Sequence, residues 1–294
     1  KDTLKWNSAI TKVKVKKRVA LTVNVEAFKV QWSVAGKNAA TADLASANAY
    51  ASVDHNGVVT GKKIGNATIV AVYQGQKIKR KLHIAGKKKI ALDAGHQSRG
   101  DSRKEPVGPG SSVRKARVAG GATGVASRVP EYKFTLSVAK RLQKELKKRG
   151  YEVYMVRTKN NVNISNKKRA MLANKSGADI YIRIHGDSSG SRGVKGASIF
   201  YPSARNPYVS RLSRSSKRLS KKLLNAYCKK TGIKKRGCSG RDDLTGTNWS
   251  KIPVTLIECG FLSNPSEDRK LQNKSFQKKM AVGMANGVDA YFGY

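Results

Sequence analysis

The chain has 294 residues and a mass of 32.0 kDa, which suits one large domain or two smaller ones. Lys and Arg total 60 against 18 acidic residues, a net charge of +42. Solubility does not require such an excess, so it favours a polyanionic partner, either nucleic acid or an acidic surface polymer. No apolar run approaches the ~18 residues of a membrane-spanning helix, and the apolar content of 39% predicts a packed globular protein.

The charge excess is spread along the chain. Residues 1–86 carry 15 basic and 4 acidic residues, and the remainder carries 45 and 14. A generally basic set of exported proteins in the source organism is the alternative explanation. The opening residues, KDTLKWNSAI, contain neither an initiator Met nor an apolar signal core, as expected of a mature or trimmed start.

Residues 1–86 carry the pattern of a small all-β domain. Five segments are apolar or alternating, rich in β-branched residues and separated by turn residues: LTVNV, FKVQWSV, GVVTG, ATIVAVY and KIKRKLHI. They predict a small antiparallel sandwich. The stretch ASVDHNGVVTGKKIGNATIVAVYQGQ resembles the group 2 bacterial Ig-like domains, whose D-x-x-G-V-V-T-G-x-x-x-G-x-A-x-I segment it contains.

After AGKKK, at residues 85–89, strands alternate with amphipathic helices, so residues 87–294 form a second predicted domain. The expected strands are IALDA, YEVYMVR, DIYIRIH, GASIFYP and VTLIECG. The expected helices are Glu131–Arg149, NKKRAMLANKSG, a long one over Val209 to Tyr227 and a final one over Phe276 to Val288. This order predicts an α/β fold, a mostly parallel or mixed sheet with helices on both faces.

The segment 97–130 is long for a connection in such a domain and is rich in Gly, Ser and Arg. It lacks a helical apolar stripe, so we expect a loop that walls a groove. Three cysteines, Cys228, Cys238 and Cys259, show no C-x-x-C pair. A bridge between Cys228 and Cys238 is one option, and unpaired cysteines are preferred.

Polar residues gather where predicted strands and helices begin or end. His96 follows IALDA, His185 ends DIYIRIH, Glu258 ends VTLIE, and Glu131 opens a helix. Open α/β sheets place their sites at the carboxyl ends of strands, and two imidazoles with one carboxylate are a common ligand set for catalytic Zn²⁺. The spacings, 35 residues from His96 to Glu131 and 54 from there to His185, match no short metal motif. Each residue alone favours a structural role.

Five separated motifs in order carry a further resemblance: LDAGHQ, VPEYKFTLSVAKRLQKEL, GYEVYMVR, ADIYIRIH and VTLIECGFLSNPSED. From about Lys89 to Tyr294 the chain resembles the zinc-dependent N-acetylmuramoyl-L-alanine amidases of bacterial cell walls. The resemblance implies one Zn²⁺ per chain with His96, Glu131 and His185 as ligands. It also implies Glu258 as the catalytic carboxylate, peptidoglycan as the substrate, and an extracellular or cell-wall location.

Three neighbouring residues allow two interpretations each. After His185 the family has Ala-Asn, whereas this chain has Gly186-Asp187. Asp187 is a turn residue, the slightly preferred interpretation, or an acceptor for an imidazole N–H. Asp93 either orients His96 or a substrate group, or closes the strand in an Asx-turn. Cys259 is a core or strand-end residue rather than a nucleophile, because both histidines of this domain are better used as ligands.

Three other functions remain as alternatives. Another zinc peptidoglycan peptidase, such as a carboxypeptidase, fits the ligand set, although the E-x-G-F-L-S-N match argues against it. A non-catalytic basic wall-binding protein fits the charge, with teichoic acids as phosphate-rich partners; nucleic acid is not expected, because no stacking platform or known module is evident. A degenerate amidase is expected to have lost one of the four site residues, and all four are present.

Overall fold

The computed structural model describes residues 3–15, 17–35, 50–62, 65–85 and 88–293. They form two compact units, the first within residues 1–87 and the second over Lys88–Lys148 and Glu152–Gly293. The boundary expected between residues 86 and 87 lies outside the described residues. No helix of the described ranges is both long enough and apolar enough to cross a bilayer.

The first unit consists of two small sheets around one core. One sheet has the order β1-β7-β6-β3 and the other β2-β5-β4. Their bounds are Lys12–Lys14 for β1, Arg18–Ala20 for β2, Gln31–Val34 for β3, Ala51–Val53 for β4, Val58–Gly61 for β5, Gly65–Tyr73 for β6 and Gln76–Ala85 for β7. Trp32 and Ile69 of the first sheet share a buried cluster with Val59 of the second.

The sequence predicted an antiparallel sandwich, but not all strand pairings in this unit are antiparallel. β6 and β7 form an antiparallel hairpin because Gln74 and Gly75, both at positive φ (46° and 78°), make a tight two-residue turn. In contrast, β1 pairs with β7 in parallel, with Lys12 opposite His83. A tight turn imposes antiparallel pairing only on adjacent strands, and β1 and β7 lie far apart in the chain.

The second unit is built on a six-stranded mixed sheet with the order β11-β8-β12-β15-β13-β14. The first four strands in that order are parallel to one another, whereas β13 is antiparallel to β15 and parallel to β14. The strands are Lys89–Ala94 (β8), Glu152–Met155 (β11), Ile180–Asp187 (β12), Ala197–Tyr201 (β13), Lys235–Gly240 (β14) and Val254–Phe261 (β15). The predicted α/β class with a mostly parallel sheet is therefore confirmed.

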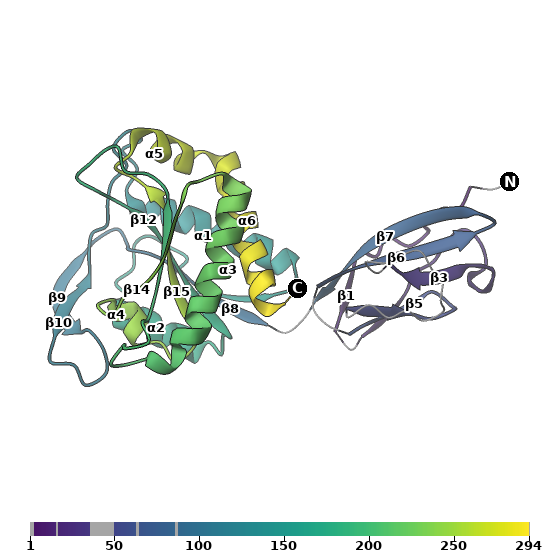
Figure 1. Ribbon diagram of the computed structural model, residues 1–294, viewed down its shortest axis with the longest axis horizontal. Coiled ribbons are helices and arrows are strands. Elements are labelled where there is room, and N and C mark those ends of the chain that lie inside the picture. The colour runs from purple at the N-terminus through teal and green to yellow at the C-terminus, as the bar shows by residue number, and fades with distance from the viewer. Residues whose placement is uncertain (1–2, 16, 36–49, 63–64, 86–87, 294) are drawn as a thin grey trace. The chain divides into compact units, whose positions relative to one another are not determined.

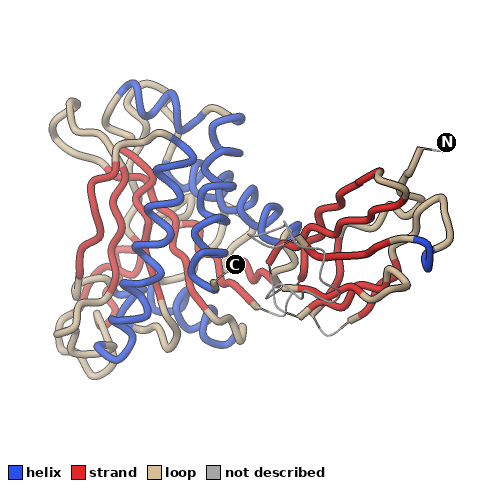
Figure 2. The backbone as a smooth tube through the Cα atoms, turned by 45° about the vertical axis from the view of Figure 1, so that its right-hand side comes forward, coloured by secondary structure: helices blue, strands red, loops and turns tan. Residues whose placement is uncertain are grey.

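Helices cover both faces of this sheet (Figures 1 and 2). They are Glu131–Lys148 (α1), Asn166–Lys175 (α2), Ser213–Thr231 (α3), Thr245–Asn248 (α4), Pro265–Gln272 (α5) and Lys274–Phe292 (α6). On one face, Thr255 of β15 hydrogen-bonds Ser220 of α3, and α6 packs between α3 and α1. On the other, Val254 shares a buried cluster with Ala170 of α2. The successive residues Val254 and Thr255 of β15 thus point to opposite faces of the sheet.

Segment 97–130 contains a β-hairpin, which the sequence analysis missed. Asp101–Pro106 (β9) pairs with Arg114–Val118 (β10) in antiparallel fashion. Their residues are mostly charged and exposed, so no apolar alternation marks them as strands. The short elements β14, α4 and α5 were also not anticipated, and the long helix α3 begins at Ser213 after a 3-10 turn rather than at Val209.

Candidate functional site

The sheet brings all four predicted site residues to its carboxyl edge. β8 and β12 pair in register with Ala94 opposite Ile184, so His96, two residues beyond β8, reaches the end of β12 at His185. His185 in turn lies opposite Glu258 on β15. Glu131 is the first residue of α1, which starts at this same edge of the sheet.

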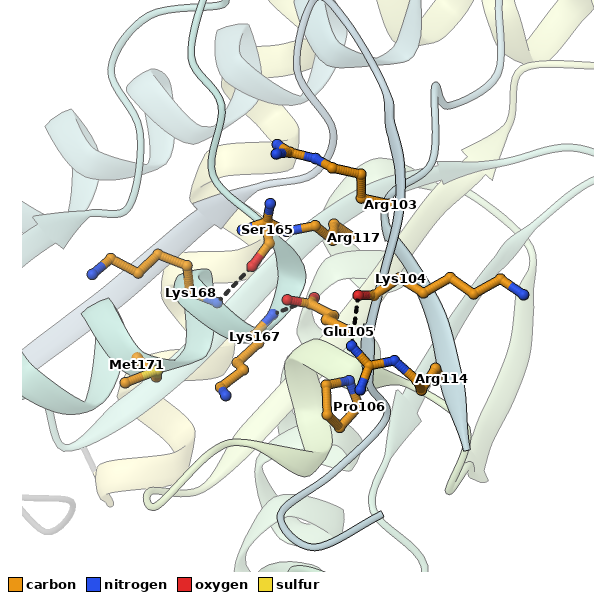
Figure 3. A pocket seen from close by; sticks show the side chains of 10 residues that line it. All are labelled: Arg103, Lys104, Glu105, Pro106, Arg114, Arg117, Ser165, Lys167, Lys168 and Met171. Atoms are coloured by element: carbon orange, nitrogen blue, oxygen red, sulfur yellow. Dashed lines mark hydrogen bonds between the residues drawn. The ribbon is translucent and has the colours of Figure 1, made fainter. Parts of the chain in front are cut away.

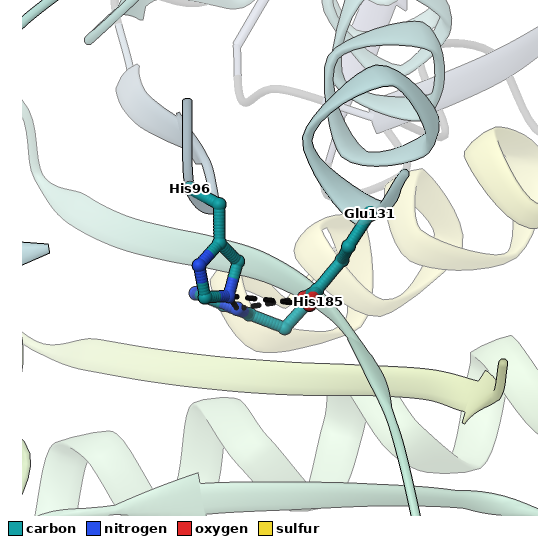
Figure 4. Close-up of side chains that lie close together, drawn as sticks. All are labelled: His96, Glu131 and His185. Atoms are coloured by element: carbon teal, nitrogen blue, oxygen red, sulfur yellow. Dashed lines mark hydrogen bonds and ion pairs between the residues drawn. The ribbon is translucent and has the colours of Figure 1, made fainter. Parts of the chain in front are cut away.

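Three of these side chains converge on one point (Figure 4). Nε2 of His96 lies 3.2 Å from Oε2 of Glu131, and Nδ1 of His185 lies 3.1 Å from Oε1 of Glu131. The same two imidazole nitrogens are 3.2 Å apart. In tetrahedral Zn²⁺ sites, ligand atoms lie about 3.4 Å from one another. The group therefore fits a metal ion, with one donor atom from each residue and all three within 4.8 Å of one another.

Hydrogen bonds orient each of these donors. Nδ1 of His96 donates to the carbonyl of Ala119 at 2.8 Å, which leaves the Nε2 lone pair free to face the group. The Glu131 carboxylate accepts from the backbone N–H of Ala122 and of Gly186. Burial lowers the pKa of His185 to about 4, so its imidazole is neutral at neutral pH, as metal binding requires.

The backbone at this edge is shaped for close approach. His96 has a φ of 59°, in the left-handed region that non-glycine residues seldom adopt. A Cβ on Gly95 would overlap the ring of His185, and one on Gly121 (φ 83°) would lie 2.9 Å from Cγ of His96. Glycine at both positions therefore makes room for the imidazoles.

Asp93 is a buried ion-pair partner rather than an Asx-turn residue. Its Oδ1 accepts from Arg169 at 2.7 Å, and its Oδ2 accepts from Arg183 at 3.1 Å and from the hydroxyl of Tyr181 at 2.9 Å. Arg169 also donates to the carbonyl oxygen of His96 at 2.9 Å. Asp93 therefore supports the strained backbone of His96 through Arg169, which is an indirect form of the interpretation that Asp93 orients His96.

Asp93→Asn is expected to lower the free energy of unfolding by about 3–5 kcal/mol, because two buried guanidinium groups lose the carboxylate that they share. Burial raises the pKa of Asp93, but the charges of Arg169 and Arg183 outweigh it and hold that pKa well below its ordinary value. A lowered carboxyl pKa stabilises the fold above the unfolded-state pKa of about 4, and this stabilisation is lost as the pH falls towards the folded-state pKa.

Urea unfolding of wild type and Asp93→Asn between pH 3 and pH 8 measures this difference. We expect a constant gap above about pH 5 that narrows in acid. The matched control is Glu152→Gln, whose carboxylate lies 4.0 Å from Lys89 and is 61% exposed; it should change stability by less than ~1 kcal/mol. Equal effects of the two variants would contradict a structural role for the buried pair.

Glu258 lies in a cleft of about 450 Å³ that His96 and His185 also line. Its Oε2 is buried and has no hydrogen-bond partner among the described residues. Burial and the charge of Glu131 raise the pKa of Glu258 well above its ordinary value. An unpartnered carboxyl oxygen beside a metal-binding group is available to exchange protons with a bound molecule.

Basic residues also line this cleft, among them Lys115 and Arg241. Lys115 of β10 donates to Oδ2 of Asp243 at 2.9 Å, and Arg241 binds the same carboxylate at 2.6 Å. The hairpin therefore walls the cleft, as expected for segment 97–130, and is tied by Asp243 to the chain that follows β14. Sequence reasoning missed both basic residues, because neither lies in a recognised motif.

Arg169 and Arg183 were also missed, although the sequence carried a signal for one of them. One charged residue interrupts the apolar run of each of the strands IALDA and DIYIRIH: Asp93 in the first and Arg183 in the second. Buried charges are rare unless paired, so opposite charges in two adjacent strands indicate a partnership. Arg169 lies on the helix α2, and only packing of that helix on the sheet brings it to Asp93.

The structure also shows the surroundings of Asp187 and Cys259, for which the sequence allowed two interpretations each. Asp187 ends β12 and accepts from the backbone N–H of Ser188 at 2.8 Å, which is local turn chemistry. Cys259 is buried on the face opposite Glu258, where its carbonyl accepts from the hydroxyl of Tyr227. Burial raises the pKa of its thiol well above the ordinary value, so it is a core residue. Cys228 and Cys238 are free thiols.

Fold and site together define an α/β protein with a His-Glu-His group, suited to a metal ion, at the carboxyl edge of its sheet. The sequence model described as N-acetylmuramoyl-L-alanine amidase matches residues 90–290. The chain therefore belongs to this amidase family. The match does not extend to the first unit.

Individual relatives agree with that assignment. "Probable cell wall amidase LytH" of Staphylococcus aureus is 25% identical over 178 residues, covering 59% of this chain and 55% of the relative. The chain thus spans about half the length of the curated relatives it matches. The N-acetylmuramyl-L-alanine amidase Ami1 of Mycobacterium abscessus is 26% identical, with a TM-score of 0.64 over 71% of this chain and 99% of that one. An N-acetylmuramoyl-L-alanine amidase of Clostridium difficile is 27% identical, with a TM-score of 0.57 over 70% and 96%.

Proposed function

We propose that this protein is a zinc-dependent hydrolase that cleaves the amide bond between N-acetylmuramic acid and L-alanine in peptidoglycan. One observation carries the proposal: the donors of His96, Glu131 and His185 converge within 4.8 Å in a chain of this family. Glu258 supports it, because its register opposite His185 brings a free carboxyl oxygen into the same cleft.

His96, Glu131 and His185 would hold the zinc through two nitrogens and one carboxylate oxygen. Bound Zn²⁺ supplies Lewis-acid chemistry, which makes water nucleophilic at neutral pH and polarises an amide carbonyl. Glu258 takes the proton of the attacking water at Oε2 and returns it to the departing amine, which leaves poorly unless protonated. Arg183 and Arg241 lower the pKa of Glu258 by less than burial and the charge of Glu131 raise it, and the positive charge of a bound Zn²⁺ would further favour the ionised form that a general base needs.

Digestion of purified peptidoglycan tests the reaction. We expect new L-alanine amino termini and intact glycan chains, identified by mass spectrometry of the products and by labelling of free amines. Release of terminal D-alanine instead would identify a carboxypeptidase and contradict the amidase proposal. A chain that binds walls without releasing any product would leave a non-catalytic binding protein as the function. Heat-inactivated protein serves as the control for chemical breakdown.

The first unit is proposed to position the enzyme rather than to take part in catalysis. Its two sheets around one core and its D-x-x-G-V-V-T-G segment support a group 2 bacterial Ig-like domain that serves as a spacer or a weak surface-binding module. Asp54, which opens that segment, accepts from the N–H groups of Asn56 and Val58 and so shapes the turn before β5.

We also propose that the enzyme acts outside the cytoplasm, in the bacterial cell wall. Peptidoglycan is found there, and the family assignment supports this location. The net charge of +42 supports additional binding to anionic wall polymers such as teichoic acids, because a polycation concentrates on a polyanionic surface. No nucleic-acid partner is proposed.

A further inference from the structure

A second, strongly basic pocket lies outside the catalytic cleft (Figure 3). It has a volume of about 410 Å³ and is formed by the hairpin β9–β10 and the start of α2. Its lining contains one acidic residue, Glu105, and six basic ones: Arg103, Lys104, Arg114, Arg117, Lys167 and Lys168. A concave site with this composition attracts anions more strongly than a flat surface of equal charge.

Acidic neighbours neutralise only part of this charge. Asp101 forms two hydrogen bonds with the guanidinium of Arg103, at 2.9 and 2.8 Å, and lies 3.5 Å from Arg117. One carboxylate therefore serves two guanidinium groups. Glu105 accepts from the backbone N–H of Lys167 at 2.8 Å, so it holds the start of the helix α2 in place.

Side chains, rather than the end of α2, are available to an anion here. The N–H of Lys167 already has Glu105 as its acceptor, and that of Lys168 has the hydroxyl of Ser165, at 3.2 Å. Lys104, Arg114 and Lys168 are exposed, and the guanidinium of Arg114 is steadied by the carbonyl of Lys104 at 3.1 Å. The pocket therefore presents cations whose positions are partly fixed in advance.

The hairpin separates this pocket from the catalytic cleft. Lys115 of β10 lines the cleft, whereas Arg114 and Arg117 line the basic pocket. Strict alternation would place Arg117 on the same side as Lys115, but the register of β10 shifts between Ala116 and Val118. Because of this irregularity, Arg117 lies on the same side of β10 as Arg114. The basic pocket and the catalytic cleft therefore lie on opposite sides of this strand.

We propose that the basic pocket binds a phosphodiester polymer of the cell wall and so holds the enzyme beside its substrate. Figure 3 shows the cationic groups spread in several directions over hairpin and helix, rather than converging on one point. Such a spread suits a chain with repeated charges better than a single small anion. Each phosphodiester carries one negative charge and two free oxygens, which match the planar fork of an arginine.

The test compares two triple variants of the full-length protein with equal loss of charge. Lys104→Gln/Arg114→Gln/Lys168→Gln removes three exposed cations of the pocket. Lys140→Gln/Lys144→Gln/Lys147→Gln removes three exposed cations of α1. Isothermal titration with synthetic poly(glycerol phosphate) measures affinity at several salt concentrations. The polymer contains no amide bond, so its binding is measured independently of hydrolysis. Failure of this site and failure of the proposed amidase activity are therefore distinguishable.

The pocket variant is expected to bind the polymer at least about tenfold more weakly than wild type. The slope of log affinity against log salt concentration is negative and should become less steep by about two. Three phosphate contacts are lost, and each such contact accounts for the release of about 0.7 counterions on binding. The α1 variant should bind within about twofold of wild type. Circular dichroism of both variants controls for folding.

Three outcomes would overturn the proposal. Equal weakening in both triple variants would mean that net charge alone drives binding. Poly-L-glutamate bound as tightly as the phosphate polymer, through the same residues, would identify a carboxylate polymer as the partner. Single-stranded DNA bound tenfold more tightly than poly(glycerol phosphate) would identify a nucleic acid.

Discussion

The Glu258→Gln enzyme is expected to hydrolyse peptidoglycan about 10²- to 10⁴-fold more slowly than wild type while keeping its metal. Glutamine has nearly the shape of glutamate but accepts no proton at neutral pH, so the attacking water and the departing amine lose their proton carrier. Oε2 of Glu258 has no hydrogen-bond partner among the described residues, so the change removes no hydrogen bond that they make with this atom. The defect should therefore be catalytic rather than structural.

Release of soluble fragments from purified cell walls measures the rate, and mass spectrometry of the intact protein measures metal content. Glu152→Gln is the matched control, because it makes the same chemical change on an exposed carboxylate of β11. A Glu258→Gln enzyme of wild-type activity would remove this residue from its proposed role. Loss of metal together with activity would instead make Glu258 part of the binding site.

Removal of the metal by a chelator is expected to abolish hydrolysis, and one equivalent of Zn²⁺ should restore it. Without the ion, no Lewis acid activates water or polarises the amide carbonyl. The imidazoles of His96 and His185 and the carboxylate of Glu131 would then face each other within 3.2 Å with no cation between them. Metal binding should accordingly also raise the melting temperature, since an ion that binds only the folded state stabilises it.

Single substitutions assign the ligands. His96→Ala and His185→Ala should each lose most of the bound zinc at stoichiometric metal, because even changes at residues that only contact a ligand reduce affinity 10- to 100-fold. His55→Ala is the control, since this histidine is exposed in a turn of the first unit. Elemental analysis of the purified variants gives the metal content. Full zinc occupancy of either ligand variant would exclude that histidine from the site.

The basic pocket and the catalytic cleft are both lined by residues of the strand β10. Lys115 on the cleft side is tied to Asp243, while Arg114 and Arg117 line the basic pocket. A polymer held by the arginines would keep the cleft close to the wall between successive cleavages. High salt should therefore weaken wall binding more than it slows hydrolysis of small soluble fragments, since screening acts mainly on exposed charges.

Local patterns predicted the class of fold and placed all four residues of the candidate site at the ends of strands or at the start of a helix, whereas their roles were implied only by the resemblance to the amidase family and stay predictions. Helical periodicity predicted α1, and the segment NKKRAMLANKSG predicted α2, whose N-cap is Ser165 with a hydroxyl that accepts from the backbone N–H of Lys168. His185 and Glu258 lie at the ends of apolar strands, so an α/β arrangement predicts their meeting at one edge. These features depend on residues within about one helical turn or a few strand positions of one another, so a single sequence is enough to predict them.

Tertiary structure alone decided which residues become partners across the fold. The hydrogen bond between Asp93 and Arg169 joins residues 76 positions apart, and its existence depends on how α2 packs on the sheet. The parallel pairing of β1 with β7, the hairpin within segment 97–130 and the shift that turns Arg117 towards the basic pocket depend in the same way on strand register. Register and packing depend on the summed burial of many side chains that are far apart in the sequence. No single segment of the chain therefore determines them.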